Sequence, residues 1–255
     1  MERNSGVIKI LLAALAVMVI FAGATYAEGH KAPGGAVPEV NSMFLIFMGI
    51  AGAIVRFVRI KFILIKKAFD LISAVIGIVL LAPVIAVVAA YIKIVSPGPV
   101  IFKQERVGKD GKVFMMYKMR TMRVDAEGST GPVWAKKNDS RMIKGGSIIR
   151  KIHVDEFPQL INVLKGDMSI IGPRPERPVF VDSLSKEIVD YRKRLAVKPG
   201  ITGLAQVWHK YDESIKDVRK KVKYDILYIR KMCVLTDMGI LLRTLIVAAL
   251  GKGAI

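Results

Sequence analysis

The feature that most constrains this chain is an uncharged apolar stretch, residues 71–92, which a proline interrupts near its middle. The stretch is about as long as a helix that spans a bilayer. Lys66 and Lys67 precede it and Lys93 follows it, so a spanning helix would carry one cationic end across the membrane, against the positive-inside tendency. Pro83 removes a helical hydrogen bond and bends the helix. The pattern leaves two structures open, a re-entrant helix that enters and leaves by one face and a kinked transmembrane helix.

Two other apolar stretches precede this one. Residues 7–27 predict either a transmembrane helix or a secretory signal sequence, and residues 28–41, rich in Gly, Pro and acids, predict a short exposed loop. Residues 43–65 are apolar but carry cations in their second half, the end that should face the cytoplasm. Both interpretations of 7–27 place residue 66 on the cytoplasmic side. We therefore predict N-terminal membrane segments in 1–65, a bent membrane helix in 66–95 and a basic polar domain in 96–250.

The charge balance limits the classes of partner. The chain has 40 Lys and Arg against 21 Asp and Glu, a net charge of +19, which is typical of proteins that meet nucleic acid, anionic membranes or phosphorylated substrates. No basic stretch shows the interleaved aromatics that stack on bases, so we expect lipid headgroups and a small phosphorylated ligand, and no nucleic acid. A single cysteine, Cys233, and three scattered histidines exclude an internal disulfide and a cysteine-built zinc site.

The basic domain shows a hairpin and two helices. Apolar residues 100–102 and 113–117 flank Lys109, Asp110 and Gly111, which predicts a β-hairpin. Apolar residues at helical spacing in 215–226 share a helix with many cations, which predicts either a helix lying on an anionic membrane or a solvated basic face over an apolar core. Residues 238–250 suit an interfacial helix, and residues 128–146 predict a mobile loop.

An acidic pair, Asp155 and Glu156, stands where a helix should begin, because Pro158 is tolerated only in a first turn and an apolar run follows it. A helix N-terminus lowers the pKa of a carboxylate and welcomes phosphate. The alternative is that the two acids only complement the helix dipole. Adjacent carboxylates repel one another, so they commonly mark an opposing charge, a metal or a reaction.

Several motifs occur in a specific order and spacing along residues 66–247. The segments that carry them are 66–70, 96–108, 117–122, 155–156, 167–175 and 198–203. In this arrangement the chain resembles the bacterial sugar transferase family, the monotopic phosphoglycosyl transferases that begin glycan and exopolysaccharide assembly on a polyprenol carrier.

The resemblance implies a mainly α membrane protein with a small β-hairpin, a re-entrant helix bent at Pro83 and amphipathic interfacial helices. It places the catalytic domain on the cytoplasmic face of the bacterial inner membrane. The implied reaction moves a sugar-1-phosphate from a UDP-sugar to polyprenyl (undecaprenyl) phosphate and releases UMP. Family members need Mg²⁺.

In that mechanism the attacking aspartate is matched by Asp155, and the glutamate tied to the metal and to the acceptor phosphate is matched by Glu156. The resulting intermediate is a covalent aspartyl-phosphosugar. Lys118, Arg150 and Arg174 are candidates to bind the donor's phosphates, because fixed cations must shield an anion before a carboxylate can approach it. Pro173 and Pro175 should hold the backbone of Arg174 rigid.

Two other functions compete with this one. The first is a non-catalytic basic membrane scaffold for glycan enzymes. The second is a glycosyltransferase that releases UDP, although the Asp-x-Asp triplet common in such enzymes is absent from the sequence. The sequence leaves open the sugar, for which loops 128–146 and 206–213 are the candidate determinants. It also leaves open the polyprenol length, the fate of residues 1–27 and the oligomeric state, a homodimer included.

Overall fold

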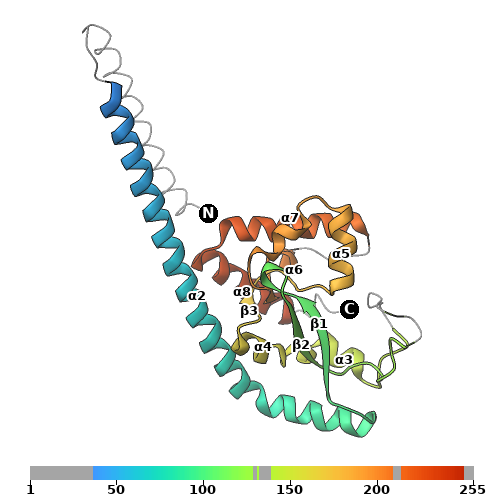
Figure 1. Cartoon of the computed structure of the whole chain (residues 1–255). Helices are drawn as coiled ribbons and strands as arrows, with labels where there is room; N and C mark the ends of the chain where they lie inside the picture. The colour runs from blue at the N-terminus through green and yellow to red at the C-terminus, as the bar shows by residue number, and fades with distance from the viewer. Residues whose placement is uncertain (1–36, 129–130, 132–138, 209–213, 250–255) are drawn as a thin grey trace. The chain divides into compact units, whose positions relative to one another are not determined.

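The computed structural model of the protein describes residues 37–128, 131, 139–208 and 214–249 (Figure 1). The chain divides into two compact units, Met1–Leu64 and Ile65–Ile255. The predictions for residues 7–27, and residues 129–130 and 132–138 of the predicted loop 128–146, lie outside the described residues. Most described residues are helical, with a small antiparallel hairpin, so the mainly α fold with a β-hairpin is confirmed.

The long helix α2 runs without a break over Val37–Val95 and contains Pro83. The prediction of a loop over 28–41 was therefore wrong for residues 37–41, which begin this helix. Pro38 falls in the first turn, where a missing N–H costs nothing. The segment Ile60–Val95 is long and apolar enough to cross a membrane.

The parts of α2 before and after Pro83 pack against the same domain. Ala74 is fully buried in a cluster with Leu160, Val163 and Met168. Ile92 is fully buried in a second cluster, which includes Ile149. The last turns of α2, teal-green in Figure 1, run in a different direction from those before them. This change of direction keeps both parts of the helix in contact with the rest of the unit.

The predicted hairpin is confirmed. Strands β1 (Ile101–Val107) and β2 (Val113–Met119) pair antiparallel, with Ile101 opposite Met119, and the 3₁₀ turn η1 (Lys109–Gly111) joins them. Asp110 and Gly111 both have positive φ, as this tight connection requires. Met116 and Met119 of β2 are buried, so this strand forms the inner side of the hairpin.

The elements that follow the hairpin are short. They are α3 (Gly146–Lys151), η2 (Val154–Glu156), α4 (Gln159–Lys165), β3 (Ser169–Ile171), α5 (Pro178–Glu187), η3 (Tyr191–Ala196), β4 (Gly200–Thr202) and α6 (Leu204–Trp208). Strands β3 and β4 pair in parallel, with Ser169 opposite Gly200. A Cβ on Gly200 would collide with the backbone nitrogen of Gly172, so only glycine permits this close approach.

Two longer helices, α7 (Ile215–Lys231) and α8 (Val234–Ala249), close the chain. Val218 and Val222 of α7 are buried in a cluster with residues of α5 and η3. The structure therefore supports the basic face over an apolar core for α7, and its apolar stripe is not free to enter a membrane. In α8, Ile240 is buried, while Leu242, Leu245 and other apolar residues are exposed.

Candidate functional site

The acidic pair lies in the first turn of η2, a short 3₁₀ helix between α3 and α4, and not in the longer helix that was predicted to begin there. Pro158 has no N–H to donate to the carbonyl of Val154, so an α-helical ladder cannot pass through this point. The Val154 carbonyl accepts from the N–H of Phe157 instead, at 3.2 Å, and α4 begins at Gln159. The proline thus separates the acids from the helix whose N-terminus was expected to hold them.

Glu156 is held by two cations. Its Oε1 accepts hydrogen bonds from Lys118 Nζ at 2.7 Å and from Arg174 Nη2 at 2.6 Å. Burial alone would raise the pKa of Glu156, but the charges of Arg174 and Lys118 outweigh it and hold the pKa well below its usual range. Oε2 has only a longer contact, 3.4 Å, with Arg174 Nη1. Glu156 is therefore ionised, and one of its oxygens retains acceptor capacity.

Asp155 has the opposite environment. The residue is 7% exposed, and no hydrogen bond or ion pair reaches its carboxylate from the residues that the structure describes. Burial raises the pKa of Asp155, and the neighbouring charge of Lys118 opposes that rise. The prediction that a helix dipole lowers this pKa was therefore wrong. Among the described residues, cations neutralise Glu156, whereas no cation forms an ion pair with Asp155.

The three candidate cations come from different elements. Lys118 lies in β2, Arg150 in α3, and Arg174 in the segment that follows β3. Arg150 donates from Nε to Thr121 Oγ1 at 2.8 Å, so it does not pair with either acid. Its charge nevertheless opposes the rise in the pKa of Asp155. The fold thus brings Lys118 and Arg174 into direct contact with Glu156, while Arg150 acts on Asp155 through its charge.

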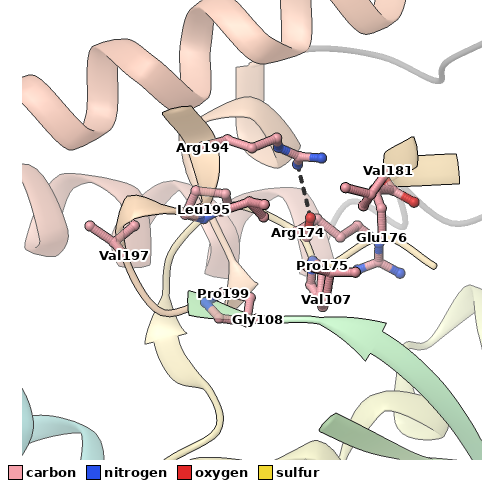
Figure 2. Close-up of a pocket in the computed structure, with 11 residues that line it drawn as sticks. Val107, Gly108, Arg174, Pro175, Glu176, Val181, Arg194, Leu195, Val197 and Pro199 are labelled. Atoms are coloured by element: carbon pink, nitrogen blue, oxygen red, sulfur yellow. Dashed lines mark hydrogen bonds between the residues drawn. The ribbon is translucent and has the colours of Figure 1, made fainter. Parts of the chain in front are cut away.

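Pro173 and Pro175 flank Arg174 and line a small pocket with it (Figure 2). The other wall includes Val107 and Gly108, at the end of β1. Pro83 lies elsewhere, in α2. The fold therefore brings Glu156, Lys118 and the 173–175 segment together, whereas Pro83 lies in the long helix.

One buried residue that supports the site was missed. Asn162 in α4 is fully buried. Its side chain forms two hydrogen bonds to the backbone of β2: Nδ2 donates to the Met115 carbonyl at 2.7 Å, and Oδ1 accepts from the Tyr117 N–H at 3.0 Å. An amide inside the apolar run 160–164 was the available signal, because a buried amide needs partners. It fixes β2 against the helix that follows the acidic pair.

A second set of missed contacts joins α2 to the strand that leads to Arg174. Asp70 Oδ1 accepts from Ser169 Oγ at 2.9 Å and from the Ile170 N–H at 3.0 Å. Lys66 Nζ pairs with Asp237 Oδ2 at 2.7 Å. The motif at 66–70 was noted in the sequence without a role, and the structure shows that its charged residues join α2 to β3 and α8.

Comparisons with known proteins show which family this sequence matches. Residues 61–251 match the family described as bacterial sugar transferase. The chain is 44% identical over 190 residues to UDP-N-acetylgalactosamine-undecaprenyl-phosphate N-acetylgalactosaminephosphotransferase of Aeromonas hydrophila, covering 74% of this chain and 45% of that protein. It is 39% identical over 193 residues to UDP-glucose:undecaprenyl-phosphate glucose-1-phosphate transferase of Escherichia coli (strain K12), covering 75% and 41%.

A shorter relative is matched along almost its whole length. The chain is 39% identical over 196 residues to an exopolysaccharide production protein of Rhizobium leguminosarum bv. phaseoli, covering 75% of this chain and 98% of that protein. The chain spans less than half the length of the Aeromonas and Escherichia proteins. The region that matches the family, residues 61–251, contains the acidic pair.

Proposed function

Because this chain belongs to the bacterial sugar transferase family, we propose that it transfers a sugar-1-phosphate from a UDP-sugar to undecaprenyl phosphate and releases UMP. The names of the Aeromonas and Escherichia relatives describe such transfers of N-acetylgalactosamine phosphate and glucose phosphate to undecaprenyl phosphate. The observation that carries the proposal is the contrast within the acidic pair. Glu156 is clamped by two cations, whereas Asp155 beside it has no partner among the described residues.

Asp155 is the nucleophile in this proposal. One of its carboxylate oxygens attacks the β-phosphorus of the donor and forms an acyl phosphate, while the bond between the β-phosphorus and the bridging oxygen breaks and UMP leaves with that oxygen. An oxygen of undecaprenyl phosphate then attacks the same phosphorus and displaces the Asp155 carboxylate. The products are undecaprenyl diphosphate sugar and the regenerated carboxylate.

The cations prepare this attack. A carboxylate approaches a doubly charged diphosphate only if fixed positive charges offset the repulsion. Arg174 offers a planar fork that suits phosphate oxygens, and Lys118 supplies a point charge beside the same acid. Both cations contact Glu156, so the donor's phosphates must share or replace these contacts when they bind.

Mg²⁺ is the proposed cofactor. Mg²⁺ is commonly held by one or two carboxylates together with substrate phosphates. Glu156 fits this role, because its Oε2 keeps acceptor capacity while Oε1 is fully used. When bound, the ion would supply positive charge to the diphosphate and to the leaving UMP. Within the described residues no three His, Cys, Asp or Glu gather into a metal cluster.

The membrane helix is proposed to be re-entrant, with the domain on the cytoplasmic face of the inner membrane. Ala74 precedes Pro83 and Ile92 follows it, and both are fully buried against the same domain. A helix that crossed the bilayer would carry one of them to the opposite side. The exposed apolar residues of α8 suit contact with the same lipid surface.

The two alternatives are less well supported. A scaffold without activity has no need for a buried, unpaired carboxylate, which costs free energy unless it has a task. A glycosyltransferase that releases UDP leaves the β-phosphate on the nucleotide, and it would not need a carboxylate aimed at phosphorus. The nature of the released nucleotide separates these possibilities.

The experiment uses the full chain in detergent or nanodiscs with Mg²⁺ and a panel that includes UDP-N-acetylgalactosamine and UDP-glucose. With undecaprenyl phosphate present, one sugar nucleotide should give UMP. Without acceptor, a rapid quench should give stoichiometric UMP and a phosphosugar adduct on the peptide that contains Asp155. Asp155→Asn should abolish both, while Asp182→Asn, at an exposed acid, is the control. Release of UDP, or an active Asp155→Asn enzyme without an adduct, would contradict the proposal.

A further inference from the structure

The backbone of residues 173–175 is held by donors from three different elements. The Gly200 N–H donates to the Pro173 carbonyl at 2.9 Å, Arg194 Nη2 to the Arg174 carbonyl at 2.8 Å, and Arg106 Nη1 to the Pro175 carbonyl at 2.9 Å. The two prolines have no N–H, so this segment cannot join a helix or a strand ladder by itself. Bonds to its carbonyls therefore determine where the Arg174 backbone lies.

Arg194 is rigidly fixed among these donors. It is 3% exposed, and its Nε and Nη2 lie 2.9 Å and 2.8 Å from Asp225 Oδ2. Its Nη1 donates to the Tyr191 hydroxyl at 3.0 Å, and both Tyr191 and Asp225 are 1% exposed. A buried charge with this geometry is costly to displace, because an unpaired ion in the interior carries a large desolvation penalty.

We infer that Arg194, locked by Asp225 and Tyr191, is a positioning residue that holds Arg174 in place for the donor's phosphates. Figure 2 shows its guanidinium directed at the Arg174 carbonyl. The carbonyl of Arg174 is thus fixed by Arg194 and its side chain by Glu156. The inference rests on the proposed function, which assigns Arg174 to phosphate binding.

The reason that this contact matters is geometric. A guanidinium stands several bonds from its own backbone, so a small rotation of the 173–175 backbone moves the fork by more than the backbone itself moves. Misplacement of a binding group by about 1 Å can cost on the order of a hundred-fold in rate. Asp225 and Arg194 form a buried pair that would also stabilise the fold, so the test must separate the two effects.

The test is Arg194→Lys in the full chain, which keeps the charge but replaces three spaced nitrogens with one. Such an ammonium pairs with Asp225 and loses the Arg174 carbonyl. We expect the KM for the accepted UDP-sugar to rise on the order of ten-fold, with a similar loss of affinity for UDP measured by calorimetry. Arg192→Lys is the matched control, because that arginine is exposed and, among the described residues, pairs only with exposed Asp182.

A double-mutant cycle gives the decisive readout. In an Arg174→Ala background, Arg194→Lys should leave KM and UDP affinity unchanged, because the residue on which it acts is gone. Val218→Ala, in the cluster that contains Tyr191, serves as a control that lowers stability without touching residues 173–175. Equal effects of Arg194→Lys with and without Arg174, an equal KM rise in Val218→Ala, or an unchanged KM would each overturn the inference.

Two further arms keep the result decisive. If Arg194→Lys does not fold, Asp225→Asn is the alternative variant, because it leaves Arg194 in place but removes the charge that fixes it. We expect it to raise KM in the same way, and to have no effect on KM in an Arg174→Ala background. If the wild-type chain releases no UMP from any donor, the proposed function fails by that result alone. The UDP affinities of the variants then still show whether Arg194 acts through Arg174.

Discussion

At the scale of single residues, two adjacent carboxylates acquire opposite properties from their surroundings. Their adjacency in the sequence marked Asp155 and Glu156 as a candidate site, and the resemblance assigned them different roles. The directions of their pKa shifts depend on which acid contacts Arg174 and Lys118. These two cations lie 18 and 38 positions from Glu156 in the chain, so a local sequence pattern does not predict the contacts. The pair was therefore predictable, but the division of charge within it was not.

The elevated pKa of Asp155 gives a prediction for pH dependence. The nucleophile must be ionised, and burial raises its pKa, so kcat/KM should fall as the pH drops through a value above that of an ordinary aspartate. Lys118 is the strongest influence that opposes this rise. Lys118→Gln should therefore move the acid limb of the kcat/KM profile to higher pH, besides lowering kcat/KM.

The measurement is UMP release across a pH series, with Lys165→Gln as the control. Lys165 donates to the Tyr117 hydroxyl at 2.7 Å and is not among the charges that act on Asp155. Its substitution should leave the acid limb in place. An acid limb that stays fixed in Lys118→Gln, or moves to lower pH, would show that another group controls it.

At the scale of elements, local patterns predicted structure where the contacts are local. Asp110 and Gly111 predicted the hairpin, because a tight turn between apolar runs needs residues that tolerate positive φ. The parallel pair β3 and β4 was not predicted, since each strand has three residues and the partners are 31 positions apart. For α7, periodicity identified the helix but left its apolar face ambiguous between membrane and core, and only the packing of Val218 and Val222 decided it.

The bend of α2 leads to a prediction of sidedness. Cysteines placed at Lys67 and at Lys103, each in a Cys233→Ser chain, should react alike with an impermeant thiol reagent from the cytoplasmic side only. The reason is that the helix parts on either side of Pro83 pack on one domain. Labelling of the two sites from opposite sides of the membrane would rule out the re-entrant helix.

Pro83 itself can be tested separately. Pro83→Ala restores a helical N–H and favours a straighter helix. The contacts of Ala74 and Ile92 cannot then both be kept without strain, so we expect lower thermal stability and reduced UMP release. Ala82→Gly is the neighbouring control, because it leaves the proline in place. Full activity and stability in Pro83→Ala would mean that packing alone bends the helix.

At the scale of the whole molecule, a buried network of charges ties the strands and helices of the second unit together. Glu176 pairs with Lys221 of α7 at 2.9 Å and with Arg106 of β1 at 3.6 Å. Burial opposes its ionisation, but Lys221, Arg194 and Arg106 lower the pKa of Glu176 from its ordinary 4.5 to about 2. No sequence signal marked this residue, because its partners are three among 40 basic residues.

Glu176 should therefore stabilise the fold in a defined pH range. Its folded-state pKa is depressed, so its contribution is full above its ordinary pKa and is lost as the pH falls from about 4.5 towards 2. Glu176→Gln should lower the unfolding free energy by roughly 1–3 kcal/mol at pH 7, and the difference from the wild type should shrink over that range. Thermal melts of the wild type and the variant at several pH values measure this difference in stability. Asp182→Asn, at an exposed acid, is the control. A difference that does not change with pH would assign the effect to packing.

The division into two units gives the last prediction, that residues 1–60 are dispensable for the chemistry. The acidic pair, its cations, the 173–175 segment and the anchors Lys66 and Asp70 all lie in the unit Ile65–Ile255. A chain that begins at Phe62 in nanodiscs should keep these contacts, so KM and the Asp155 adduct should match those of the full chain even if the yield falls. A second truncation that begins at Leu71 removes Lys66 and Asp70 and should lose stability and activity, because Asp237 and Ser169 lose their partners. If the chain from Phe62 folds, as judged by its melting curve, yet forms no adduct, the N-terminal unit contributes to the reaction and the prediction is wrong.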